Sequence, residues 1–155
     1  MNTERNQLIL AIPLLFVLVP TLWAQTRAGS DMLAAREAAL AAGDLDGVLK
    51  VFADDAVVAT SSGRLLIGKE QIRVWVTDQL TRRQREESGA RQLQGNKLTW
   101  GGKVYRDDWQ ELGVSPLEVR QDAIIEGGRI KFFNTTFVPE SADKLEAARK
   151  KQPAR

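Results

Sequence analysis

The segment from Ala34 to Gly68 constrains the fold more than any other part of this chain, because its hydrophobic spacing changes from helical to strand-like and back. Ala42-Gly43-Asp44 ends one helix and supplies an N-cap for the next. In that second helix Leu45, Val48, Leu49 and Phe52 recur at three- and four-residue spacing, which predicts one core-facing side. Asp44 and Asp46 resemble a carboxylate pair, but capping explains the first of them.

The same segment continues as a hairpin and a third helix. Ala56 to Thr60 and Arg64 to Ile67 predict two short strands joined by Ser61-Ser62-Gly63, where glycine can adopt a positive φ. From Lys69 onward, the apolar positions predict one stripe along a helix: Ile72, Trp75, Val76 and Leu80. We interpret Trp75 as a core residue or as part of a pocket wall.

The second half of the chain predicts mainly strands. Residues 96–100 and 103–105 are expected to be extended, with a bulge or bend at Gly101-Gly102. A short helix ending at Gly113 and a last helix from Pro139 to about Lys150 frame a closing hairpin. That hairpin consists of residues 117–125, the Gly127-Gly128 turn, and residues 129–138.

The order of these elements resembles the SnoaL-like, nuclear transport factor 2-like superfamily. The resemblance rests on residues 34–68 and on the closing hairpin, where a glycine turn is followed by a basic residue and Ile130. It covers about Asp31 to Pro139 and implies an α+β cone, with three N-terminal helices packed on a curved, mostly antiparallel sheet. The superfamily includes isomerases, hydrolases, cyclases, dehydratases and inert binding modules, so the resemblance implies a pocket and leaves the reaction open.

Residues 1–24 are expected to be a signal peptide or an N-terminal membrane anchor. An almost continuous apolar run from Leu8 to Pro20 follows Arg5, and Ala24 offers a small residue for cleavage before Gln25. We therefore expect export to the periplasm or the medium. Contact with a membrane is expected only if residues 7–24 stay attached as an anchor. Residues 25–139 then form the SnoaL-like domain, and residues 140–155 form a C-terminal helix and basic tail.

Composition excludes several functional classes. Removing the leader leaves about 131 residues, which suits one domain. The 22 Lys and Arg nearly balance 20 Asp and Glu, and no broad basic face with interleaved aromatics is visible, so no nucleic-acid partner is expected. With no cysteine there is no disulfide, and with no histidine there is no Ser/His/Asp triad and no imidazole metal site. We expect neither a metal nor a cofactor.

Candidate site residues come from the closing hairpin and from the resemblance. Alternation along residues 117–125 separates two faces. Counting back from the glycine turn, as in ketosteroid isomerases, the resemblance implies that the pocket-facing residues are Arg120, Asp122, Ile124, Phe133, Thr135 and Phe137. Asp122 would be a base or a hydrogen-bond anchor and Arg120 would orient it or bind an anion. The alternative is an ion pair at the rim without a functional role.

The remaining candidates complete the pocket and a dimer surface. Tyr105 and Thr135 are expected to position a small ligand. The opposite strand face would present Val119, Ala123 and Ile125 as an apolar patch, which fits the homodimers common in this superfamily.

Arg106-Asp107-Asp108 resembles the Asp-Arg-Asp arrangement of limonene-epoxide hydrolases. A capping box followed by a glycine favours a short structural helix instead.

Three functions stay open. The first is an exported protein that binds a small apolar or amphipathic molecule. The second is a lyase, isomerase or hydrolase that uses Asp122 as its base, because an apolar pocket raises the pKa of a carboxylate. The third is an association module whose cavity is filled by Trp75, Phe133 and Phe137.

Overall fold

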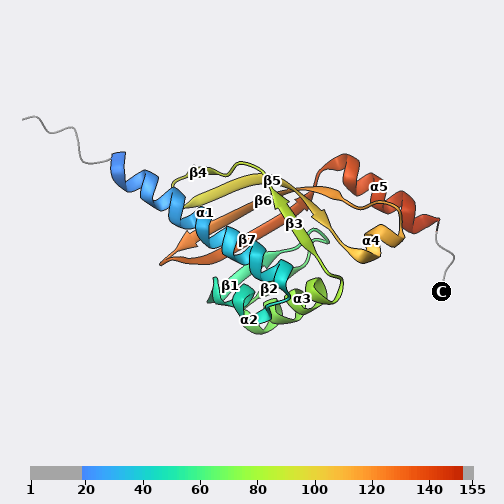
Figure 1. Ribbon diagram of the computed structural model, residues 1–155, viewed down its shortest axis with the longest axis horizontal. Helices are drawn as coiled ribbons and strands as arrows, with labels where there is room; N and C mark the ends of the chain where they lie inside the picture. The colour runs from blue at the N-terminus through green and yellow to red at the C-terminus, as the bar shows by residue number, and fades with distance from the viewer. Residues whose placement is uncertain (1–18, 152–155) are drawn as a thin grey trace, which may run out of the picture.

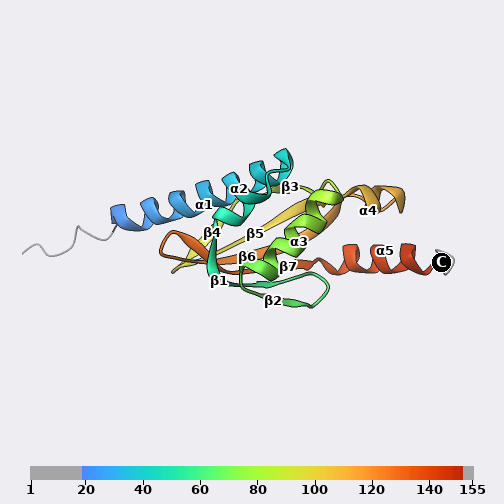
Figure 2. The ribbon, with the colours of Figure 1, turned by 90° about the horizontal axis from the view of Figure 1, so that it is seen from below.

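The computed structural model describes residues 19–151, with side chains described from residue 27 onward. Five helices pack on one curved sheet (Figure 1). The helices are α1 (Val19–Ala42), α2 (Leu45–Lys50), α3 (Lys69–Thr81), α4 (Asp107–Glu111) and α5 (Pro139–Lys150). Figure 2 shows that α1 and α3 lie on the same side of the sheet, and that α4 and α5 lie together at the end away from the N-terminal half of α1.

The sheet has seven strands in the order β2-β1-β7-β6-β5-β3, and β4 pairs with β5 outside this path. The strands are β1 (Phe52–Ala59), β2 (Leu65–Ile67), β3 (Arg85–Ser88), β4 (Gln92–Gln94), β5 (Lys97–Tyr105), β6 (Leu117–Glu126) and β7 (Arg129–Phe137). All pairings are antiparallel except that of β1 with β7. The predicted α+β class with a curved, mostly antiparallel sheet is confirmed.

The prediction of three N-terminal helices matches only in part. α1 begins at Val19 and runs through Ser30 and Asp31, two residue types that often cap a helix. The alanine-rich sequence around these residues favours helix strongly enough to override their capping tendency. Strands β3 and β4 were not predicted, and β1 begins at Phe52, earlier than expected. The expected boundary at residues 24 and 25 falls inside α1 and stays a prediction.

Several local predictions are confirmed. Asp44 caps α2 through its Oδ1, which accepts a hydrogen bond from the Gly47 amide at 2.9 Å. Gly63 in the β1–β2 turn has a φ of 79°. Residues 97–105 form the one extended strand that was predicted, but its pairing with β6 has no register shift at Gly101-Gly102, so the bulge predicted there is not found. The leader residues 1–18 lie outside the described residues, and no helix within residues 19–151 is long and apolar enough to cross a membrane.

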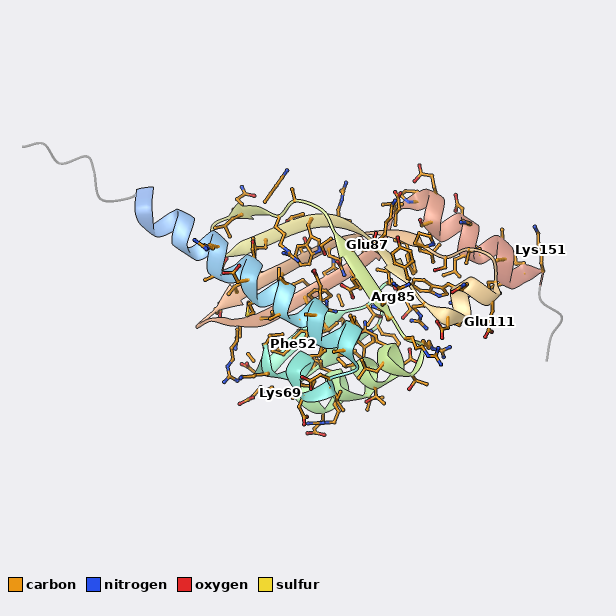
Figure 3. All side chains as sticks on the ribbon, in the orientation of Figure 1. Phe52, Lys69, Arg85, Glu87, Glu111 and Lys151 are labelled. Carbon is orange, nitrogen blue, oxygen red and sulfur yellow. The ribbon has the colours of Figure 1, made fainter. Side chains whose placement is uncertain are left out.

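The core lies between the helices and the concave face of the sheet (Figure 3). Phe133 on β7 is fully buried at its centre, with ring centroids of Phe52, Trp75 and Trp100 6.1 to 6.2 Å away. A second cluster around Trp109 and Leu145 joins α4 and α5 to the sheet. These two clusters enclose the space in which the candidate site lies.

Candidate functional site

A bulge in the closing hairpin decides which face of β6 points into the cone. Ile125 pairs with Ile130, but the next residue back, Ile124, pairs with Phe132, so β7 contains one extra residue here. Because side chains alternate with a period of two, a one-residue shift moves every β6 residue to the opposite face. The interior therefore receives Val119, Gln121 and Ala123.

Arg120, Asp122 and Ile124 were predicted to face the pocket. This prediction is wrong, because the bulge leaves these three residues on the outer face of the sheet. Asp122 contacts Lys97 at 2.7 Å and accepts a hydrogen bond from Asn134 at 2.9 Å. Arg120 is exposed and forms no ion pair with Asp122. The apolar patch expected from Val119, Ala123 and Ile125 is also not there, because Val119 and Ala123 are buried inside and Ile125 packs against the core.

The prediction for β7 holds. Phe133, Thr135 and Phe137 line an inner chamber of about 40 Å³ within the cone, and Trp75 from α3 forms part of its wall. Such a chamber holds a few water molecules or one small group of a ligand. Tyr105 does not line it, because its hydroxyl lies outside and donates to Glu87 at 2.9 Å.

A buried ion pair forms one side of this chamber. Arg36 from α1 donates from Nη1 to Glu86 Oε2 at 2.9 Å and from Nη2 to Oε1 at 3.2 Å. The two side chains are 0% and 2% exposed. Gln84 and Gln121 also donate to the carboxylate, at 2.9 and 3.3 Å.

The network fixes the protonation state of Glu86. Burial alone would raise the pKa of this carboxyl, but the charge and hydrogen bonds of Arg36, together with those of Gln121 and Gln84, outweigh it and hold the pKa below its usual value. Glu86 is therefore ionised and accepts four hydrogen bonds. A carboxylate in this state anchors the chamber and is a weak proton acceptor.

A wider cavity of about 190 Å³, the mouth, lies next to the chamber. The two spaces adjoin, since the same five residues line both: Ser61, Trp75, Arg106, Trp109 and Phe137. The β1–β2 turn, α3, α4 and α5 surround the mouth. Its walls are aromatic on one side and carry hydroxyl and guanidinium groups on the other.

Arg106 lies where chamber and mouth meet. Its Nε and Nη2 donate to Asp108 at 3.0 and 2.9 Å, and its guanidinium lies 4.7 Å from the ring centroid of Trp109. Asp78 approaches Nη2 at 3.7 Å, so an Asp-Arg-Asp arrangement does exist. Burial raises the pKa of Asp108, but the hydrogen bonds and charge of Arg106 and the charge of Arg82 outweigh it and lower the pKa below its usual value. The short helix predicted here is confirmed, although Arg106 rather than an aspartate occupies its N-cap position.

Sequence reasoning missed the central polar residues, Arg36 and Glu86. One signal was present, because Arg36 lies on the same helical face as Leu33 and Leu40, three and four residues away. A cation in an apolar stripe indicates a buried partner. Within residues 27–151, no group of three or more acidic side chains that could hold a metal is found.

Comparison with known proteins shows the fold. No protein-family model and no curated protein matches the chain. A solved NTF2-like protein of unknown function from Cytophaga hutchinsonii is 14% identical, with 76% of this chain and 94% of that chain covered and a TM-score of 0.60. The chain adopts the NTF2-like fold. The resemblance to the SnoaL-like, NTF2-like superfamily is thereby confirmed, without a specific subfamily.

Two further structural neighbours have names that mention a ligand or a reaction. A candidate polyketide cyclase from Sinorhizobium meliloti is 25% identical over 68% of this chain and 94% of that chain, with a TM-score of 0.59. TerC, co-crystallised with polyporic acid, is 13% identical over 76% of this chain and 97% of that chain, with a TM-score of 0.62. The structural neighbours thus include a ligand complex as well as NTF2-like proteins of unknown function.

Proposed function

We propose that this protein binds a small amphipathic molecule in the mouth and inner chamber of the cone. The observation that carries the proposal is the pair of adjoining cavities, a mouth and a polar chamber, which share Trp75, Trp109 and Phe137 in their walls. Ligand sites in proteins are typically apolar clefts with a few fixed polar groups. An apolar or aromatic body would fill the mouth, and polar groups of the ligand would contact the polar residues of the chamber and of the mouth.

Gln79 supplies a polar contact for that group. Its side-chain oxygen is buried and accepts no hydrogen bond from another described residue. The residue is 4% exposed and lines the chamber. Because an unsatisfied buried acceptor costs about 1–3 kcal/mol, a hydroxyl or amide donor entering the chamber would recover that free energy.

Binding without catalysis fits the carboxylates around the cavity better than acid-base chemistry does. Glu86, Asp108 and Asp78 each contact an arginine, and the pKa values of Glu86 and Asp108 are lowered. A general base works best with a pKa near the working pH. Asp122, on which the lyase, isomerase or hydrolase alternative depended, lies on the outer face of the sheet.

The test is an NMR titration of the full chain with 2-naphthalenemethanol. We expect the indole N–H signals of Trp75 and Trp109 to shift and saturate more strongly than that of Trp100, which lies deeper in the core. Ser61→Phe, which adds a ring at the mouth, should abolish the shifts, whereas Thr136→Phe on the exposed outer face should not. Shifts that survive Ser61→Phe, or no shifts in the wild type, would refute the proposal.

A homodimer through the outer face of the sheet is a separate proposal. Leu65 and Ile67 on β2 are 64% and 63% exposed, and the register of Ile67 continues across Val57 on β1 to Phe132 on β7. Exposed apolar side chains that line up on one sheet face favour association. Light scattering should give the mass of a dimer for the wild type and of a monomer for Ile67→Asp, with Val74→Asp on α3 as the control. A monomeric wild type would contradict the proposal.

Export is proposed from the sequence of the leader. The run Leu8–Pro20 behind Arg5 is typical of an exported protein, and a chain without cysteine needs no disulfide to fold there. Cell fractionation with intact-mass analysis should find the protein in the envelope or medium, cleaved after Ala24 or still attached to the membrane. A full-length protein confined to the cytosolic fraction would contradict it.

A further inference from the structure

We propose that the ligand is an aromatic carboxylate, whose ring lies between the aromatic walls of the mouth and whose carboxylate binds the arginines there. This inference rests on the proposed binding function and deepens it. It follows from the balance of charge at the mouth, from the hydrogen-bonding state of Arg106, and from the shape of the aromatic walls.

The residues that line the mouth carry an excess of positive charge. Three arginines line it, Arg64, Arg106 and Arg149, and Asp78 is the one carboxylate among them. Asp78 is already paired with Arg82, at 2.8 Å, and faces Arg106 at 3.7 Å. Arg64 and Arg149 are exposed, and their side chains form no ion pair or hydrogen bond with another residue in the range 27–151. An anion entering the mouth therefore meets uncompensated cations.

The guanidinium of Arg106 is held in one position, but not all of its N–H groups donate hydrogen bonds. Asp108 takes two of its donors, Nε and Nη2, and the Trp109 ring supports the guanidinium plane. Nη1 donates to no residue within the described part of the chain, and the side chain is 16% exposed. A guanidinium fixed by packing loses little conformational entropy on binding an oxyanion, which favours affinity.

The aromatic walls of the mouth favour an aromatic ring as the part of the ligand attached to the anionic group. Trp109 and Phe137 lie edge to face with centroids 5.5 Å apart, and Trp75 lines the same space. Aromatic rings pack on such walls with an energy beyond that of area burial alone. A free inorganic anion would use the arginines and leave the walls uncovered, so an aromatic carboxylate fits both features.

The β1–β2 turn adds neutral donors beside the arginines. Ser61 and Ser62 are exposed at the mouth, and the Thr60 and Ser62 hydroxyls lie 3.0 Å apart. Hydroxyl groups can donate to carboxylate oxygens, and hydrogen bonds to a charged group are about twice as strong as neutral ones. The carboxylate is therefore expected to lie between this turn and Arg106.

The test compares 2-naphthoate with 2-naphthalenemethanol, which share the ring and differ in the charge. Calorimetry on the full chain should show naphthoate binding at least about tenfold tighter, the ratio expected from one charge-assisted hydrogen bond. The double variant Arg64→Gln/Arg149→Gln should remove most of that ratio, because it weakens naphthoate binding far more than naphthalenemethanol binding. Arg120→Gln, an exposed arginine on the outer face, is the matched control and should change neither.

The outcomes separate the two proposals. If both probes bind equally to the wild type, or if the double variant weakens both alike, the carboxylate inference is wrong and the binding function stands. If inorganic phosphate at the same concentration displaces naphthoate completely and binds as tightly, the aromatic part of the inference is wrong. If neither probe binds, the proposed function fails and the inference fails with it.

Discussion

The Arg36–Glu86 pair should make stability depend on both partners together. Glu86→Gln leaves the guanidinium of Arg36 fully buried without a counter-charge, and it replaces one of the two carboxylate oxygens, each of which accepts two hydrogen bonds, with an NH2 donor. Breaking one side of a buried pair costs about 3–5 kcal/mol. That is a large part of the stability of a single domain, so the midpoint of urea unfolding should fall sharply.

The double variant Arg36→Met/Glu86→Gln removes both charges. It should cost clearly less than the sum of the two single changes, with a coupling of about 2 kcal/mol or more, because neither charge is then left alone. Urea unfolding followed by tryptophan fluorescence measures all four proteins. Single variants that each cost under about 1 kcal/mol, or costs that simply add, would refute a tightly coupled pair.

The pH dependence of stability tests the same ion pair, and it should have opposite signs in the wild type and in Arg36→Met. In the wild type the pKa of Glu86 is lowered in the folded protein, so its contribution is present above the unfolded pKa of about 4.3 and is lost as the pH falls below it. In Arg36→Met, only the hydrogen bonds of Gln121 and Gln84 still oppose the effect of burial, which is the largest single cause, so the folded pKa of Glu86 should lie above the unfolded one. That variant should therefore gain stability as the pH falls from about 8 toward 5.

Three further changes test the packing and the sheet. Gly102→Ala brings a Cβ to 2.8 Å from the Glu87 carbonyl oxygen, so it should lower the free energy of unfolding in urea by about 1–3 kcal/mol. In the control variant Gly101→Ala the nearest contact of the Cβ is at 3.8 Å, so the free energy of unfolding should change by no more than about 0.5 kcal/mol. Phe133→Ala should cost about 3–5 kcal/mol by the same assay, because it opens a cavity among three aromatic rings; a smaller cost would show that the core collapses around it. Asp122→Ala should leave calorimetric binding of 2-naphthoate unchanged, since this carboxylate lies outside the cone; a loss of affinity would contradict the β6 register.

Local sequence signals predicted the elements that depend on local chemistry. The Asp44 cap, the β1–β2 turn at Gly63 and the apolar stripe of α3 all appear where their residue types require them. These features depend on neighbours within a few residues, so the sequence reveals them directly.

Which face of β6 points into the cone depends on one extra residue in β7, and no local sequence pattern reveals that residue. Lys131 lies opposite the step from Ile124 to Ile125, where the pairing with β7 shifts by one. The alternation of side chains along β6 was predicted correctly. The register of β6 against β7 was not, and this error placed Asp122 on the wrong face of the sheet. A bulge depends on how two strands pack, which spacing within either strand does not reveal.

Strand β3 was missed because its sequence is almost entirely polar. Arg85–Ser88 begins with the last residue of the polar run Arg82-Arg83-Gln84-Arg85. Gln84 and Glu86 nevertheless point inward, and they are stabilised there by Arg36 from a helix far away in the sequence. Hydrophobic patterning cannot find a strand whose inward residues are satisfied by a distant charge.

The most direct test of a ligand-binding cone is native mass spectrometry of the full chain purified gently from the cells that make it. The account predicts that the wild type retains a small-molecule mass that is lost on denaturation, and that Ser61→Phe does not retain it. A bare wild-type protein, or a Ser61→Phe variant with the same retained mass in the same proportion, would contradict the account.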